Sequence, residues 1–155
     1  MRNWKVWALV AIGLGSFTAC SDDDDATGEN IITVSPQTTR SILQNGTWKV
    51  DHFKIGDIDQ TSNYELVELE FMSLGVLSIQ EDQTTHTGLW AVSNDTDITP
   101  GTNLNAPEIE ITVNGSDLIN LLADDWDIRS ISESEINLED NEGNVTYHLR
   151  LKRTE

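Results

Sequence analysis

The segment Val145-Thr146-Tyr147-His148-Leu149-Arg150-Leu151-Lys152 alternates apolar and polar side chains without interruption. Because successive side chains of a β-strand point to opposite faces, this period of two predicts a strand with one buried face. The same alternation recurs in further short segments, at residues 48–50, 67–71, 77–79, 90–92, 109–113, 126–128 and 136–138. The sequence therefore predicts an all-β domain of about eight short strands.

Short polar turns separate several of these segments, for example at residues 73–75 and 140–144, and such turns are typical of antiparallel hairpins. We expect an antiparallel meander that is either closed as a barrel or folded as a β-sandwich. Two short helices are predicted, at residues 39–45 and 116–124, because each stretch begins with a hydroxyl side chain that can cap a helix. The long stretch at residues 94–107 has no periodicity, which predicts a functional loop.

The first 19 residues follow the order of a secretory signal. Arg2 and Lys5 precede an apolar run at residues 6–14, and small residues then lead to Cys20. A membrane-spanning helix needs about 20 apolar residues, and this run is roughly half as long. Residues 1–19 are therefore expected to be a signal peptide that is removed from the mature chain.

The residues just before Cys20 resemble the lipobox of bacterial lipoproteins, in which a small residue such as Ala19 precedes an obligatory cysteine. Phe17 and Thr18 depart from the commoner residues of that pattern. The resemblance implies cleavage before Cys20 and attachment of lipid to its sulfur. Cys20 is the only cysteine, so it has no intramolecular disulfide partner. Two or three acyl chains would anchor the protein stably on a membrane.

An acidic run follows the cysteine, made of Ser21, Asp22, Asp23, Asp24 and Asp25. This arrangement resembles the export signal of surface lipoproteins in Bacteroidota, which implies a lipid-anchored protein of the outer membrane or cell surface. The alternative is a solvated acidic linker with no receptor. Residues 20–38 are expected to form the anchor, export signal and flexible linker, and residues 39–155 the folded domain.

The composition limits the partners of the protein. The chain carries 9 Lys and Arg against 27 Asp and Glu, a formal net charge of −18. Removal of the signal peptide takes away Arg2 and Lys5 and no acidic residue, which leaves −20. Such a charge disfavours binding to nucleic acid and to anionic lipid surfaces. We therefore expect no nucleic-acid partner.

Gly46, Thr47 and Trp48, which follow the first predicted helix, resemble the Gly-x-Trp opening of lipocalins. Together with the order of the later strands, residues 42–153 resemble the lipocalin-like domains of Bacteroidota lipoproteins. The resemblance implies an eight-stranded antiparallel barrel whose Trp48 packs at the closed end under a cation, either Arg150 or Arg153. Trp48 as an ordinary core residue is the alternative.

A barrel of eight strands is either filled by its own side chains or holds one small ligand. Alternation places a large apolar set on the inward face, and an apolar ligand would contact Phe71, Trp90, Ile111, Trp126 and Tyr147. The mouth of such a cavity would involve the loop at residues 94–107. The sequence leaves both alternatives open.

No catalytic, cofactor or metal site is predicted. Strand alternation points His52 and His86 inward and His148 outward, but two histidines on separate strands have no fixed proximity for a metal. The only cysteine is expected to be lipidated, and no serine lies in a Gly-x-Ser-x-Gly motif. We expect a non-catalytic protein that binds a small apolar ligand or a partner in its mouth. The alternative is a structural or accessory subunit of an outer-membrane complex with a filled barrel.

Overall fold

The computed structural model describes residues 34–94 and 107–154. The predicted signal peptide, Cys20, the acidic run at residues 21–25 and the interior of the predicted loop lie outside the described residues.

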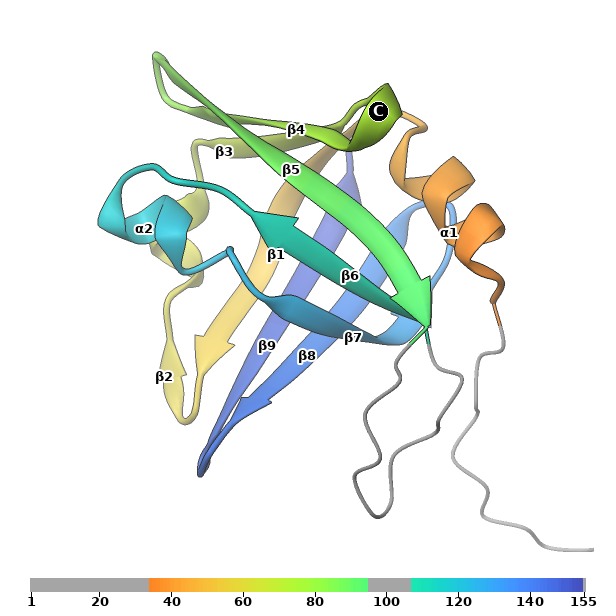
Figure 1. Ribbon diagram of the computed structural model, residues 1–155. Helices are drawn as coiled ribbons and strands as arrows, with labels where there is room; N and C mark the ends of the chain where they lie inside the picture. Colours follow the sequence, from red (N-terminus) through yellow and green to blue (C-terminus); the bar gives the residue numbers. More distant parts are fainter. Residues whose placement is uncertain (1–33, 95–106, 155) are drawn as a thin grey trace, which may run out of the picture.

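Antiparallel strands form one sheet that closes on itself (Figure 1). Eight strands make the barrel, in the order β1-β3-β4-β5-β6-β7-β8-β9, and β2 is a two-residue strand paired with the end of β1. The predicted eight-stranded antiparallel barrel is confirmed, and the β-sandwich alternative is wrong. The strands are β1 (Thr47–Ile55), β2 (Ile58–Asp59), β3 (Val67–Phe71), β4 (Val76–Glu81), β5 (Thr84–Asn94), β6 (Pro107–Thr112), β7 (Asp125–Ile131), β8 (Glu135–Glu142) and β9 (Val145–Arg153).

Pairing between β1 and β9 closes the barrel. Its register runs from Trp48 opposite Arg153 to Ile55 opposite Tyr147. The eight barrel strands therefore have a neighbour on both sides, and closure removes the exposed edges that would otherwise invite pairing with other chains. The inward faces supply a continuous apolar core.

A β-bulge interrupts β1 at Asp51 and changes which side chains point inward. Val50 pairs with Leu151, but His52 pairs with Arg150, so Asp51 is an extra residue on its strand. Buried positions consequently move from Trp48 and Val50 to Phe53. The prediction that His52 points inward is wrong, because strict alternation across residues 48–52 ignored this extra residue.

Both predicted helices exist, with different bounds. α1 spans Pro36–Leu43 and begins three residues earlier than predicted, because the Ser35 side chain accepts a hydrogen bond from the Thr38 N–H and Pro36 fits the first helical turn. α2 spans only Asp117–Asn120, with Ser116 as its N-cap. Two short 3-10 turns, η1 (Thr61–Tyr64) and η2 (Ser73–Gly75), complete the fold.

The two helices lie at opposite ends of the barrel, which we name the α1 end and the α2 end (Figure 1). At the α1 end, the buried indole of Trp48 donates a hydrogen bond from Nε1 to the carbonyl of Leu43, at 2.9 Å. Arg40 extends from α1 to the Val92 carbonyl, at 2.7 Å. The helix is thereby joined to both β1 and β5.

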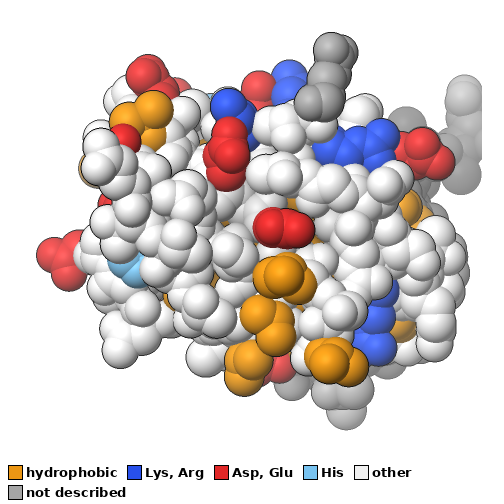
Figure 2. All heavy atoms as spheres, turned by 90° about the horizontal axis from the view of Figure 1, so that it is seen from above, with side chains coloured by type: hydrophobic (Ala, Val, Ile, Leu, Met, Phe, Trp, Pro, Cys, Tyr) orange, Lys and Arg blue, Asp and Glu red, His pale blue; other side chains and the backbone are white. Residues whose placement is uncertain are grey.

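Some large apolar side chains remain on the outside. Seen from above, the surface carries a cluster of hydrophobic side chains with acidic ones beside it (Figure 2). The exposed large hydrophobic residues of the described chain are Ile58, Leu66, Met72, Leu74, Leu89, Leu121 and Val145.

Replacing Trp48 with Phe should lower the free energy of unfolding by about 1–3 kcal/mol, because the buried carbonyl of Leu43 then loses its hydrogen bond. Trp90→Phe is the matched control. Its indole donates to the carbonyls of Met72 and Val76, and each of these keeps another donor. Urea unfolding followed by circular dichroism measures both variants. Equal losses in the two variants would contradict the role assigned to the Trp48 hydrogen bond.

Candidate functional site

Four of the five predicted ligand-binding residues form part of a filled core, and the fifth, Tyr147, is partly buried and packs against it. Phe71, Trp90, Ile111 and Trp126 are buried. The rings of Phe71 and Trp90 meet edge to face with centroids 5.3 Å apart. Phe53 on β1 meets Trp126 on β7 at 6.3 Å. Since aromatic rings from separate strands meet inside the barrel, its described interior is occupied by its own side chains.

Two of these predicted ligand-binding residues hold connecting segments in place. Trp90 Nε1 donates to the carbonyls of Met72 and Val76, both at 3.0 Å, and so supports the turn between β3 and β4. Trp126 Nε1 donates to the Leu122 carbonyl at 3.1 Å, just after α2. Their indoles therefore support the fold at both ends of the barrel.

The cation expected near Trp48 is Arg153. Arg153 lies opposite Trp48 in the β1–β9 register, and its guanidinium donates to the Asn45 carbonyl at 3.3 Å. Arg150 lies elsewhere: its Nε is 2.6 Å from a carboxylate oxygen of Asp51. Of the two arginines proposed from the sequence, only Arg153 is placed at the α1 end.

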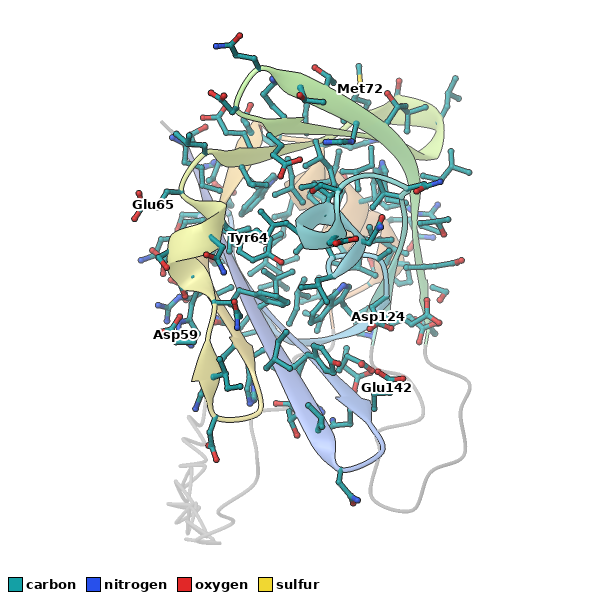
Figure 3. The ribbon with its side chains drawn as sticks, turned by 90° about the vertical axis from the view of Figure 1, so that its left-hand side faces the viewer. Asp59, Tyr64, Glu65, Met72, Asp124 and Glu142 are labelled. Carbon is teal, nitrogen blue, oxygen red and sulfur yellow. The ribbon has the colours of Figure 1, made fainter. Side chains whose placement is uncertain are left out.

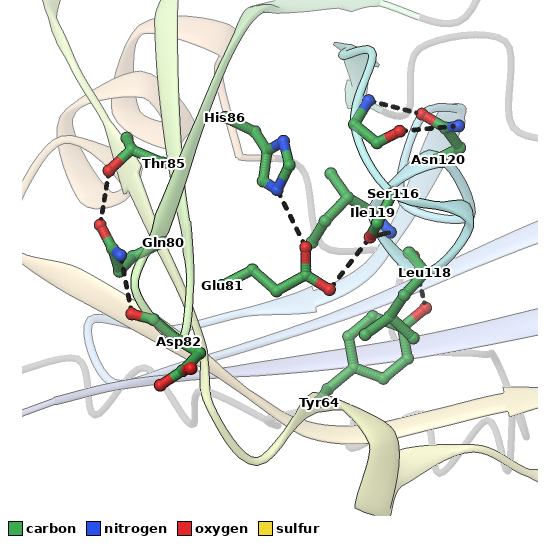
Figure 4. Close-up of polar contacts among 11 residues, drawn as sticks. Tyr64, Gln80, Glu81, Asp82, Thr85, His86, Ser116, Leu118, Ile119 and Asn120 are labelled. Atoms are coloured by element: carbon green, nitrogen blue, oxygen red, sulfur yellow. Dashed lines mark hydrogen bonds and ion pairs between the residues drawn. The ribbon is translucent and has the colours of Figure 1, made fainter.

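The α2 end is covered by α2 and the residues that follow it. Ile119 and Leu122 are fully buried there. The hydroxyl of Tyr64 donates a hydrogen bond to the Leu118 carbonyl at 3.0 Å (Figures 3 and 4). This hydrogen bond connects α2 to the segment before β3. Burial and the nearby charge of Glu81 raise the pKa of Tyr64, so this donor keeps its proton.

A carboxylate links α2 to β5. One oxygen of Glu81 accepts a hydrogen bond from the Ser116 hydroxyl at 3.0 Å, and the other lies 2.9 Å from His86 Nε2 (Figure 4). His86 lies opposite the buried Ile79, as strand alternation predicted. Because Glu81 lies between the two, Ser116 does not donate to the imidazole as an activated nucleophile would. The cluster positions α2.

Acidic side chains gather at the rim of the α2 end. Asp124 and Glu142 lie on this rim in Figure 3, and Asp140 and Tyr147 are opposite each other in the β8–β9 register. Burial raises the pKa of Asp140, and the negative charge of Asp124 raises it further. Burial and the neighbouring carboxylate of Glu142 also raise the pKa of Tyr147. The sequence does not reveal this cluster, because its members come from separate segments.

A network of ion pairs covers the outer face of β1, β7, β8 and β9. Asp51 accepts from Arg150 and also lies 3.1 Å from Lys152 Nζ. Burial opposes ionisation of Asp51, but the hydrogen bonds from these two cations outweigh it and lower its pKa. Arg129 lies 2.9 Å from Glu139 in the same network. The cations of this face are thus paired with carboxylates from the same surface.

A hollow of about 290 Å³ on this face brings together His52, Arg129, His148 and Arg150. The Nδ1 atom of His148 is 3.4 Å from Glu139, and that of His52 is 3.4 Å from the Thr61 hydroxyl. In the part of the chain that the structure describes, no group of three or more His, Cys, Asp or Glu is arranged to hold a metal ion.

Charge is divided unevenly between the two halves of the barrel. No Lys or Arg occurs from Ile55 to Ile128, a stretch that contains β3, β4, β5, β6 and α2. The cations of the barrel itself lie on β1, β7 and β9. One half of the barrel wall is therefore acidic and the other nearly neutralised by its ion pairs.

Comparison with protein-family models, with curated proteins and with solved structures found no match. The resemblance to Bacteroidota lipoproteins therefore remains a prediction from the sequence.

Among the described residues, no helix has the length and apolar character required to cross a membrane.

Replacing Asp140 with Asn should stabilise the fold at neutral pH. A raised pKa means that the folded state holds the proton of Asp140 more tightly than the unfolded state does. The resulting stability is present at low pH and is lost as the pH rises above about 4 and through the folded pKa. Urea unfolding at about pH 4 and pH 8 should show that the variant has a larger free energy of unfolding than wild type only at the higher pH. Asp125→Asn, at an exposed site nearby, is the control, and an equal gain there would refute the explanation.

Proposed function

We propose that this protein is a lipid-anchored accessory or binding subunit of the outer membrane or cell surface, and that it acts through its outer surface. The observation that supports this proposal best is the filled barrel. Phe53, Trp126 and Phe71 occupy the space that a lipocalin ligand would need, and one end is covered by α2 and the residues after it, with Ile119 and Leu122 buried there. A small apolar ligand would enter only after several buried side chains had moved.

The hollows of the described surface also favour a protein partner. Four of them have volumes of about 260, 290, 310 and 490 Å³. The largest of these four is bordered by Val50 of β1 and by the polar residues Asp59, Thr61, Ser62 and Glu65. Small-molecule sites are typically clefts of roughly 300–1,000 Å³ with mostly apolar walls. The two smallest hollows fall below this range and suit side chains of a partner, and four of the five residues that border the largest are polar.

The anchor is proposed from the sequence. The signal peptide, Cys20 and the acidic run occur in the order expected of an exported lipoprotein. From Cys20 to Val34, a linker of 14 residues could extend at most about 50 Å. A linker of this length would allow the barrel to meet partners near the membrane.

Replacing Cys20 with Ala should abolish metabolic labelling with a fatty acid, because the acceptor sulfur is lost. Replacing all four aspartates of the acidic run with Ala should preserve the label but remove the protein from the protease-accessible cell surface. Wild type labelled in parallel is the reference. Label that persists without Cys20 would refute the anchor, and unchanged surface exposure would reduce the acidic run to a linker.

The filled barrel predicts that the purified chain binds no apolar probe in a saturable way at micromolar concentration. A fluorescent fatty acid serves as the probe, and Ile119→Ala, which opens space at the α2 end, is the matched positive control.

Photo-crosslinkers placed along the outer surface should capture one dominant protein partner in intact cells. Saturable probe binding by wild type would instead favour the small-ligand function, and an absence of any dominant partner would contradict the accessory role.

A further inference from the structure

Three exposed apolar side chains lie around the turn at η2, and we name them the apolar tip: Met72, Leu74 and Leu89. Their exposed fractions are 44%, 98% and 61%. Met72 points away from the barrel in Figure 3. Leu74 and Leu89 line the same hollow on the outer wall. Scattered exposed leucines are ordinary, but grouped ones indicate a surface that is covered by a partner.

Leu74 adopts a backbone conformation that folding alone would not select for leucine. Its φ of 63° and ψ of 20° fall in the left-handed region, which Gly and Asn adopt more readily. Its side chain gains almost no burial in return. Both the backbone conformation of Leu74 and the exposure of its apolar side chain are unfavourable for folding, which suggests that the residue has a role other than stabilising the fold.

Hydrogen bonds and close packing hold the turn that carries Leu74. The indole N–H of Trp90 donates to the carbonyls of Met72 and Val76, and the backbone N–H of Met72 donates to the Val76 carbonyl at 2.8 Å. Gly75 lies so close to β5 that a Cβ atom there would be 2.9 Å from the Trp90 carbonyl. Since the turn is already ordered, binding at the tip would require little further loss of conformational entropy.

The hollow beside Leu74 sets the size and charge of an occupant. It measures about 260 Å³ and is lined by Leu74, Leu89, Ala91, Glu110 and Thr112 among others. This volume is below the roughly 300–1,000 Å³ of typical small-molecule sites, so an inserted side chain fits it better. Glu110 provides a negative charge beside an apolar wall.

The charges around the tip favour one kind of binding partner over the others. Among the described residues, neither Glu110, which lines the hollow, nor Glu70 of β3, two residues before Met72, takes part in an ion pair. Arg40 is the nearby cation, and it donates to the Val92 carbonyl. A second copy of this acidic chain and an anionic membrane would both be repelled. A basic polypeptide would be attracted.

We propose that the apolar tip docks a polypeptide partner that presents an apolar side chain flanked by Lys or Arg. The apolar side chain enters the hollow between Leu74 and Leu89, and a basic neighbour pairs with Glu110. This inference rests on the proposed function as an accessory subunit and names the chemistry of its partner.

The test uses the purified full chain and a fluorescein-labelled peptide, Gly-Ser-Lys-Arg-Phe-Leu-Lys-Arg-Ser-Gly, with binding measured by fluorescence anisotropy. Two comparison peptides carry Glu in place of every Lys and Arg, or Ser in place of Phe and Leu. The basic apolar peptide should bind at least tenfold more tightly than either. Its affinity should fall at least tenfold in Leu74→Asn and in Leu89→Asn. Glu110→Gln should weaken binding a few-fold and reduce its dependence on salt.

Leu66→Asn is the matched control, because Leu66 is an exposed leucine outside the tip. It should leave peptide affinity unchanged. Leu74→Asn should unfold at or above the wild-type urea midpoint, since Asn tolerates the left-handed conformation, so a loss of binding would not reflect misfolding. The proposal would be overturned if the acidic peptide bound as tightly as the basic one. It would also be overturned if Leu66→Asn lowered peptide affinity as much as Leu74→Asn does, or if Leu74→Asn left that affinity unchanged.

Two further measurements test the other occupants. Binding to phosphatidylcholine vesicles that is weakened by Leu74→Asn would assign the tip to a lipid surface and overturn the proposal. A dimer detected by analytical ultracentrifugation and lost in Leu74→Asn would assign it to a second copy, with the same consequence. If crosslinkers in intact cells capture a dominant partner through another face, the accessory function stands and the docking role of the tip fails.

Discussion

Pairing of β1 with β9 is the constraint on which the rest of the structure depends, because it joins the first and last barrel strands over almost their whole length. An open sheet of eight twisted strands would leave two edges and an apolar face exposed. Closure places that face inside, where rings from separate strands meet. The bulge at Asp51 occurs within this same pairing, and bulges increase the twist that closure requires.

Closure leaves the two ends of the barrel to be covered, and three indoles contribute to this. Trp48 donates to the end of α1, Trp90 to the turn at η2, and Trp126 to the segment after α2. In each case a ring buried in the core carries one N–H to a backbone carbonyl in a connecting segment. A tryptophan is suited to this task because its large apolar ring carries a single polar atom at its edge. The barrel is therefore filled and covered by the same side chains.

The fold was largely predictable because alternation with period two is a local property of the chain. A segment of each barrel strand was predicted, although most strands are longer than predicted and the two-residue β2 was not predicted. The prediction of an inward His52 failed because a bulge depends on the pairing partner and leaves no mark in the alternation. The site was less predictable. Whether Trp126 binds a ligand or a carbonyl of its own chain depends on where α2 lies, and this is a tertiary property.

The uneven charge of the barrel follows from the same topology. In a meander, consecutive strands are neighbours, so a stretch of sequence without Lys or Arg becomes a continuous acidic region of the wall. The first and last barrel strands, β1 and β9, pair with each other, so the cations near the two ends of the domain sequence lie on one side of the barrel. There Arg150 pairs with Asp51, and Arg129 pairs with Glu139. A surface that satisfies its own charges attracts partners weakly, whereas unpaired carboxylates create a field that steers cations. The half of the barrel that carries the apolar tip is therefore the half whose electrostatics would favour the basic partner that we propose.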